Sequence, residues 1–228
     1  MSIIEKRNQE KRCRGAIFDM DGLMFDTEKV FQETWHELAK EREIELPEDF
    51  VQAITGTSGE HMNRVLEHYY QVADGVVIRE ECMKRVGMKL EKEVPKKAGI
   101  DELLMYLKEK GYRLAVASSS PQELIEHHLK KAGVSKYFDA VVSGTRLEHG
   151  KPAPDIFLLA AEKISCDPKE CYVFEDSANG VKAGYAAGCV TVMVPDQIPP
   201  SEEIKALDIE ICSSLGEAQK LIQKCEKF

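Results

Sequence analysis

Two aspartates lie two residues apart directly after the first apolar run of the chain. The stretch "GAIFDMDG" at residues 15–22 begins like a buried strand and turns acidic at Asp19 and Asp21. A carboxylate is costly to bury without a partner. These two groups therefore either face solvent at a turn or share a cation. Taken alone, the pair Asp21–Gly22 could be no more than a turn signal.

Other polar side chains follow later apolar runs in the same way. Ser118 and Ser119 follow "RLAVA", Lys151 lies in the loop after "AVVSG", and Glu175 and Asp176 end "CYVFED". Because open α/β sheets bind ligands at the carboxyl ends of their parallel strands, we expect these groups to converge. Carboxylates held close together repel unless a cation joins them. A set of oxygen ligands suits a hard cation, and beside a phosphate this is Mg²⁺. The predicted metal ligands are Asp19, Asp21, Glu175 and Asp176.

The elements that must position these residues follow an alternating pattern. The unbroken apolar run at residues 14–18 predicts a strand buried on both faces, and further strands are predicted at 113–120, 139–143, 171–176, 190–194 and 209–212. Helical spacing lies between them, at 121–132, 154–164 and 178–188. This alternation predicts an α/β fold, a Rossmann-like parallel sheet core with helices on both faces. Residues 28–94 show helical spacing and no strand. We therefore predict a core domain from residues 1–27 and 95–228, with an inserted α-helical cap domain at 28–94.

Three glycines, Gly180, Gly184 and Gly188, recur at intervals of four in the predicted helix 178–188. Their spacing does not fit the G-x-G-x-x-G fingerprint of dinucleotide binding. We interpret them instead as sites of close packing between the helix and the sheet.

Composition narrows the classes of function. The chain has 228 residues, 43% of them hydrophobic, which is enough for a sizeable core. Its formal net charge of -9 and the lack of a basic stripe argue against a nucleic-acid partner. The seven cysteines are odd in number and include no C-x-x-C pair, which favours a reducing compartment over disulfides or zinc. No apolar run resembles a signal peptide or a membrane span, so we predict a cytoplasmic protein without a membrane partner. The oligomeric state stays open.

Four motifs together resemble a known family. "FDMDGLMFDTE", "VASSS", "GKPAPDIF" and "VFEDSANGVKAG" match, in order and spacing, the motifs of the haloacid dehalogenase-like hydrolases. The helical insert is similar to the cap of the subgroup that contains β-phosphoglucomutase and phosphoglycolate-type phosphatases. The resemblance spans roughly residues 14 to 195. It implies a Mg²⁺-dependent enzyme that acts on a small phosphorylated metabolite.

The resemblance also implies a role for each matching position. Asp19 would be the nucleophile and form an aspartyl-phosphate, and Asp21 would be the general acid and base. Ser118 and the backbone N–H of Ser119 would bind phosphoryl oxygens, and Lys151 would pair with the phosphoryl group and the nucleophile. The metal would be held by Asp19, the backbone carbonyl of Asp21, Asp176 and, directly or through water, Glu175.

A phosphatase and a sugar-phosphate mutase share this machinery. The mutases of the subgroup carry a histidine shortly after the D-T pair and a cap arginine for the distal phosphate. Phe31 and Gly59 stand at those positions in this chain, which favours phosphatase activity on small phosphomonoesters, most of all sugar phosphates. The β-phosphoglucomutase-like mutase remains the alternative. A non-catalytic binding module is disfavoured, because such a protein would have lost some of Asp19, Asp21, Lys151 and Asp176, and none is lost. A dehalogenase is also disfavoured, because its chemistry needs no metal and "VFEDS" supplies carboxylates for one.

Overall fold

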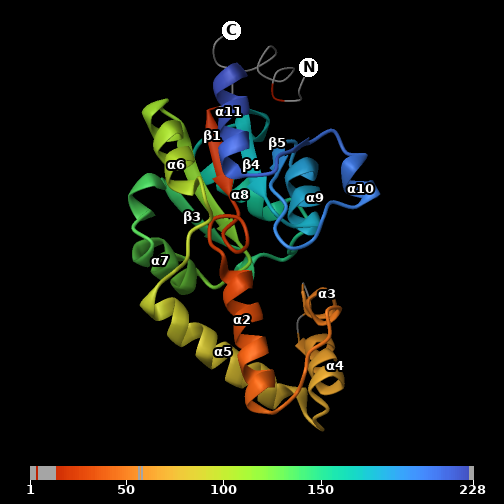
Figure 1. Cartoon of the computed structure of the whole chain (residues 1–228). Helices are drawn as coiled ribbons and strands as arrows, with labels where there is room; N and C mark the ends of the chain where they lie inside the picture. The colour runs from red at the N-terminus through yellow and green to blue at the C-terminus, as the bar shows by residue number, and fades with distance from the viewer. Residues whose placement is uncertain (1–3, 5–13, 56, 58, 226–228) are drawn as a thin grey trace. The chain divides into compact units, whose positions relative to one another are not determined.

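A six-stranded parallel sheet forms the centre of the larger part of the protein (Figure 1). The computed structural model describes residues 4, 14–55, 57 and 59–225. The strand order is β3-β2-β1-β4-β5-β6, and every pairing is parallel. This confirms the predicted α/β fold. The strands are β1 (Gly15–Phe18), β2 (Arg113–Ser118), β3 (Ala140–Ser143), β4 (Cys171–Glu175), β5 (Val190–Met193) and β6 (Glu210–Ile211).

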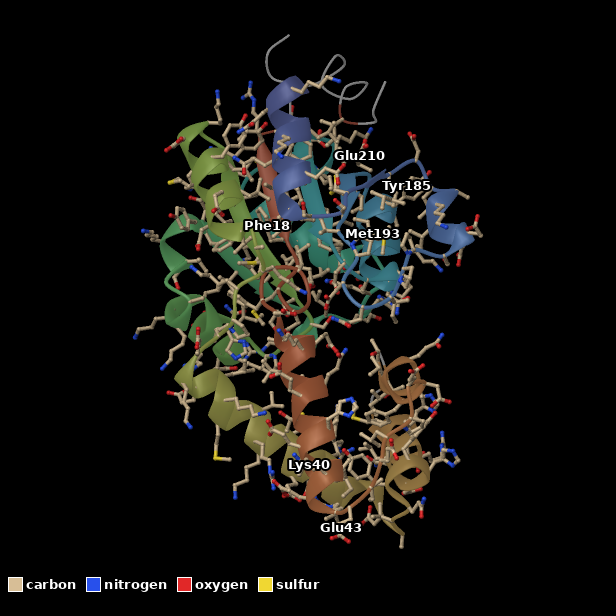
Figure 2. All side chains as sticks on the ribbon, in the orientation of Figure 1. Phe18, Lys40, Glu43, Tyr185, Met193 and Glu210 are labelled. Carbon is tan, nitrogen blue, oxygen red and sulfur yellow. The ribbon has the colours of Figure 1, made fainter. Side chains whose placement is uncertain are left out.

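The register of the sheet aligns the ends of the central strands. Phe18, the last residue of β1, pairs with Val116 of β2 and with Phe174 of β4. Figure 2 labels Phe18 on β1 and Met193 on β5, the residue that pairs with Glu175. The chain runs outward from β1 to β3 and then crosses back to β4, so the order reverses between β1 and β4. An open α/β sheet forms its ligand-binding crevice at such a reversal.

Helices cover both faces of this sheet. They are α6 (Ile100–Glu109), α7 (Gln122–Lys131), α8 (Asp155–Lys163), α9 (Ala178–Ala186), α10 (Glu202–Lys205) and α11 (Leu215–Cys225). Helix α6 packs beside α11, and α8 beside α9. Ile17 and Val173 belong to the apolar cluster under α8, while their neighbours Phe18 and Phe174 stack with ring centroids 4.7 Å apart. Burial on both faces explains why the central strands β1 and β4 appear in the sequence as nearly unbroken apolar runs.

Gly184, within α9, and Gly188, two residues after its end, have different roles. A Cβ atom on Gly184 would lie 2.9 Å from both Thr191 Oγ1 and Val173 Cγ1, which confirms close packing against β4 and β5. Gly188 makes no such approach, so its assignment as a packing residue is wrong. Its φ of +78° lies in the left-handed region, and it follows the last turn of α9 as a C-terminal cap residue does.

The chain divides into two compact units, Met1–Asp26 with Pro95–Phe228, and Thr27–Val94. We call the second unit the cap. It consists of α2 (Thr27–Glu41), α3 (Phe50–Ile54), α4 (Gly59–Tyr70) and α5 (Gly75–Lys92). The first predicted domain limit, between residues 27 and 28, differs from the division of the units by one residue. The short helix α3 was not predicted, because five residues carry too little periodicity.

The cap has its own apolar core, built around Trp35, Phe50, Leu66, Tyr70 and Cys82. Within it, the Tyr70 hydroxyl donates a hydrogen bond of 2.6 Å to the Trp35 carbonyl. This bond satisfies a polar group that would otherwise be buried without a partner. The cap therefore contains the buried apolar surface that a separate folding unit needs.

The described cysteines are free thiols: Cys82, Cys166, Cys171, Cys189 and Cys212. Cys13 and the side chain of Cys225 lie outside the described part of the chain. Among the helices that the structure describes, none is long and apolar enough to cross a membrane.

Candidate active site

The candidate site lies at the carboxyl edge of the sheet, where β1, β2 and β4 end. The Asp19 N–H donates to the Phe174 carbonyl at 3.0 Å, which extends the β1–β4 pairing by one residue. Asp19 is thereby held level with Glu175, the last residue of β4. Asp19 is 7% exposed and Glu175 1% exposed. Both carboxyl groups are therefore nearly removed from bulk water.

The chain reverses sharply after Asp19. Gly22 has a φ of +85°, its N–H donates to the Phe25 carbonyl at 2.9 Å, and the Met24 N–H donates to the Met20 carbonyl at 2.9 Å. Met20, Met24 and Phe25 are fully buried, so these residues belong to the core. The buried apolar side chains anchor the loop, and Asp21 lies half-buried within it.

Lys151 provides the positive charge of the site. Its Nζ donates to Asp19 Oδ1, to Glu175 Oε1 at 2.7 Å and to the Ala117 carbonyl at 3.4 Å. The same Nζ lies 5.0 Å from the ring centroid of Phe157 on α8. The Lys151 side chain is only 9% exposed, so a buried ammonium joins Asp19, which follows β1, to Glu175 at the end of β4.

Glu175 is held from its other side by the start of α9. Its Oε2 accepts hydrogen bonds from the Ser177 N–H at 2.8 Å and the Ser177 hydroxyl at 3.0 Å. Ser177 in turn caps α9, because its Oγ accepts from the Gly180 N–H at 3.1 Å. A Cβ on Gly180 would lie 1.6 Å from Glu175 Oε1, and a Cβ on Gly22 would lie 2.3 Å from Asp176 Oδ2. Two glycines thus leave the space that these carboxylates occupy.

Burial and mutual repulsion perturb the charged groups. Burial raises the pKa of Asp19 to about 8, a rise that Lys151 opposes and Glu175 reinforces. Burial, together with the charges of Glu175 and Asp19, also raises the pKa of Asp176. Burial alone would lower the pKa of Lys151, but the two carboxylates that it contacts outweigh this effect and raise it. The cluster therefore favours additional positive charge.

Three of the carboxylates suit a divalent metal. Asp19, Glu175 and Asp176 each offer an oxygen, and these oxygens lie within 4.8 Å of one another. Carboxylate oxygens this close to one another could share one hard divalent cation such as Mg²⁺. When all three are ionised, they exceed the single charge of Lys151 by two negative charges. A hard divalent cation would balance this excess.

The serines at the end of β2 contact the second aspartate. The Ser120 hydroxyl donates to Asp21 Oδ2 at 2.9 Å, whereas the Ser118 hydroxyl lies 3.4 Å from the same oxygen. Ser118 is buried, and Ser119, predicted to bind phosphate through its N–H, is exposed. Ser120 could not be identified from the sequence, because the run of three serines does not indicate which hydroxyl turns toward Asp21.

All the predicted site residues thus lie at one edge of the sheet: Asp19, Asp21, Ser118, Ser119, Lys151, Glu175 and Asp176. Two further residues near the site were also missed. Phe157 lies under Lys151 as part of an apolar helix face, and Ser177 binds Glu175 while capping α9. The only sequence signal for Ser177 was its position before a helix.

A parallel sheet with an inserted helical cap and a buried acid–lysine cluster at the strand ends agrees with the hydrolase family that the four sequence motifs indicate. The chain belongs to the haloacid dehalogenase-like hydrolases, whose family model matches residues 16–194. It is 36% identical over 178 residues to a phosphorylated carbohydrates phosphatase of Thermotoga maritima, covering 76% of this chain and 81% of that protein. It is 32% identical over 189 residues to the fructose-1-phosphate phosphatase YqaB of Escherichia coli K12, covering 81% and 97%. The chain is therefore a phosphatase of this family.

A solved structure with the same fold belongs to the other branch of the predicted subgroup. The crystal structure of β-phosphoglucomutase from Clostridium difficile superposes with a TM-score of 0.68 at 26% identity. The superposition covers 94% of this chain and 97% of the mutase. This similarity confirms the predicted helical cap and the predicted subgroup.

Proposed function

We propose that this phosphatase hydrolyses small phosphomonoesters of carbohydrates with Mg²⁺, through an aspartyl-phosphate on Asp19. The observation that carries the proposal is the buried cluster in which Lys151 contacts both Asp19 and Glu175 and Asp176 lies within metal-binding reach. The names of the Thermotoga and Escherichia relatives, a phosphorylated carbohydrates phosphatase and a fructose-1-phosphate phosphatase, support the substrate class. We also propose that the protein works in the reducing environment of the cytoplasm, which its free thiols support.

In the first step, a carboxylate oxygen of Asp19 attacks the phosphorus of the ester. The new bond forms as the bond from phosphorus to the ester oxygen breaks, and Asp21 gives its proton to the leaving alkoxide. The Ser118 hydroxyl and the Ser119 N–H would bind phosphoryl oxygens. Lys151 holds Asp19 in position and places a positive charge next to the transferred group.

In the second step, the ionised Asp21 accepts a proton from water, and the water oxygen attacks the phosphorus of the aspartyl-phosphate. Inorganic phosphate leaves, and the Asp19 carboxylate and the Asp21 proton are restored. Mg²⁺, when bound, neutralises charge on the phosphoryl oxygens. Asp19, the Asp21 carbonyl, Asp176 and Glu175 would hold it.

Acid-quench labelling tests the two aspartates. With a substrate labelled at phosphorus, the wild-type protein should yield labelled protein, and Asp19→Asn should yield none. Asp21→Asn should slow turnover by about 10²–10⁴-fold, since general acid–base catalysis contributes this much. Labelling of the Asp19 variant, or full turnover in excess EDTA, would contradict the proposal.

The second candidate function is the phosphoryl shuttle of a mutase, which the similarity to β-phosphoglucomutase favours. Phe31 and Gly59 stand where that function would need a histidine and an arginine. Three of the described cap cations, Arg42, Arg85 and Lys89, pair with glutamates. Phosphorus NMR of one incubation with β-glucose 1-phosphate and glucose 1,6-bisphosphate separates the two. We expect inorganic phosphate, whereas clean conversion to glucose 6-phosphate would identify a mutase.

A further inference from the structure

We infer that Ser120 is a positioning residue, which orients the acid–base carboxyl group of Asp21. The inference rests on the proposed function, because it takes Asp21 as the proton donor and acceptor. The Ser120 hydroxyl donates to Asp21 Oδ2 at 2.9 Å, across 99 residues of sequence. The Ser118 hydroxyl reaches the same oxygen only at 3.4 Å. Hydrogen bonds weaken over this range, so the Ser120 hydroxyl makes the stronger of these two contacts with Asp21 Oδ2.

Ser120 is itself fixed by its neighbours. Its N–H donates to Ser118 Oγ at 3.1 Å, and its carbonyl accepts from the Ser143 hydroxyl at 2.6 Å. Thr145 Oγ1 lies 2.9 Å from Ser143 Oγ, which adds a further hydroxyl behind the first. Pro121 follows, and its carbonyl accepts the first hydrogen bonds of α7. The hydroxyl that meets Asp21 is therefore presented by a loop tied to β2, β3 and α7.

This bond has a consequence for proton transfer. When Asp21 is ionised, the Ser120 hydroxyl donates to its Oδ2, and this bond orients the carboxylate for proton transfer. The carboxyl group is also restrained from rotating about its χ2 bond. A catalytic group that is misplaced by about 1 Å can lose about 10²-fold in rate. Ser120 thus acts in both steps that use Asp21, giving a proton to the leaving alkoxide and taking one from water.

Two substrates with different leaving groups isolate this role. A hexose 6-phosphate leaves as an alkoxide that must be protonated, whereas p-nitrophenyl phosphate leaves as a stable phenolate that needs no proton. Phosphoenzyme formation and decay are measured by rapid acid quench in Ser120→Ala. Formation from the hexose ester and decay by water should each slow by about 10–100-fold. Formation from p-nitrophenyl phosphate should stay close to the wild-type rate.

Matched variants complete the experiment. Ser120→Thr keeps the hydroxyl and should restore most of the lost rate. Ser143→Ala removes the hydrogen bond to the Ser120 carbonyl. It should slow the same two steps as Ser120→Ala, by a smaller factor. Ser135→Ala, an exposed serine beyond α7, should match the wild type. The melting temperature of each variant shows whether it is folded. If Ser120→Ala is unfolded, the same rate measurements on Ser143→Ala test the inference instead.

The possible outcomes distinguish an error in the proposed function from an error in the inference about Ser120. If Asp21→Asn slows both substrates equally in the formation step, the acid–base role is wrong and the proposed function fails with it. If Asp21→Asn discriminates between leaving groups but Ser120→Ala does not, only the inference about Ser120 is overturned. A Ser120→Ala variant with a raised KM and an unchanged kcat would make Ser120 a substrate-binding residue instead.

Discussion

Replacement of Gly180 by alanine probes how tightly the acidic cluster is built. A Cβ at this position would lie 1.6 Å from Glu175 Oε1 and 1.9 Å from its Cδ. The end of a glutamate side chain can often move, but here it is held. Lys151 binds one carboxylate oxygen, and the Ser177 N–H and hydroxyl bind the other. The added methyl group must therefore displace Glu175 from at least one of these partners.

The magnitude follows from three terms. Overpacking a filled interior destabilises by about 1–3 kcal/mol. Loss of one hydrogen bond to a charged group adds about 1.5–3 kcal/mol. Alanine in a helix offsets these by up to about 1 kcal/mol relative to glycine. We expect Gly180→Ala to lower the free energy of unfolding by about 1.5–6 kcal/mol and to weaken Mg²⁺ binding, measured by calorimetric titration.

Gly87→Ala is the matched control. Gly87 is also a helical glycine, in α5, but nothing lies within 4 Å of its added Cβ. It should stabilise the protein by up to about 1 kcal/mol. Denaturant unfolding is followed by circular dichroism and by the fluorescence of Trp35, the single tryptophan, which lies in the cap. A Gly180→Ala protein with a wild-type midpoint and wild-type Mg²⁺ affinity would refute the close packing around Glu175.

Three further predictions test the electrostatics and the cap. Because the folded pKa of Asp19 is raised from 3.8 to about 8, the stability it contributes is present at low pH and lost as pH rises through about 8. In EDTA, the melting temperature of wild type relative to Asp19→Asn should therefore fall between about pH 5 and about pH 9; a constant difference would contradict the raised pKa. Gly22→Ala combines a φ of +85° with a Cβ 2.3 Å from Asp176 Oδ2, so calorimetry should show weaker Mg²⁺ binding than in the wild type. Tyr70→Phe removes the bond to the Trp35 carbonyl and should lower the stability of the cap by about 1 kcal/mol, measured by Trp35 fluorescence.

The parts of the site that could be predicted from sequence share one property. Asp19 and Asp21, and likewise Glu175 and Asp176, interrupt long apolar runs, and a carboxylate at the end of a buried strand has few structural explanations. Parallel pairing then determines that strand ends meet at one edge. This requires only the order of elements along the chain, so the sheet and the acidic cluster could be inferred together.

The rest depends on distances that no local pattern contains. In sequence, Lys151 is one lysine in a loop, and only the fold brings it between Asp19 and Glu175. Ser120 could not be distinguished from its two neighbours, because the choice depends on how the loop turns after β2. Gly188 shared its spacing with Gly180, yet one residue ends a helix and the other makes room for a carboxylate.

The cluster also explains why this edge of the protein is built at the expense of stability. Two buried carboxylates, Asp19 and Glu175, and the half-buried Asp176 are balanced by one ammonium, and the pKa values of Asp19 and Asp176 are raised. Apolar residues of similar volume would remove this repulsion. The same repulsion disappears when a cation enters, so the binding free energy of Mg²⁺ includes the relief of a strain already present in the fold. Gly22 and Gly180 leave the space in which Asp176 and Glu175 lie close enough to bind the same cation. Stability in the metal-free protein and affinity for the metal are thus coupled through the same carboxyl groups, and a substitution that neutralises one of them should raise the first as it lowers the second.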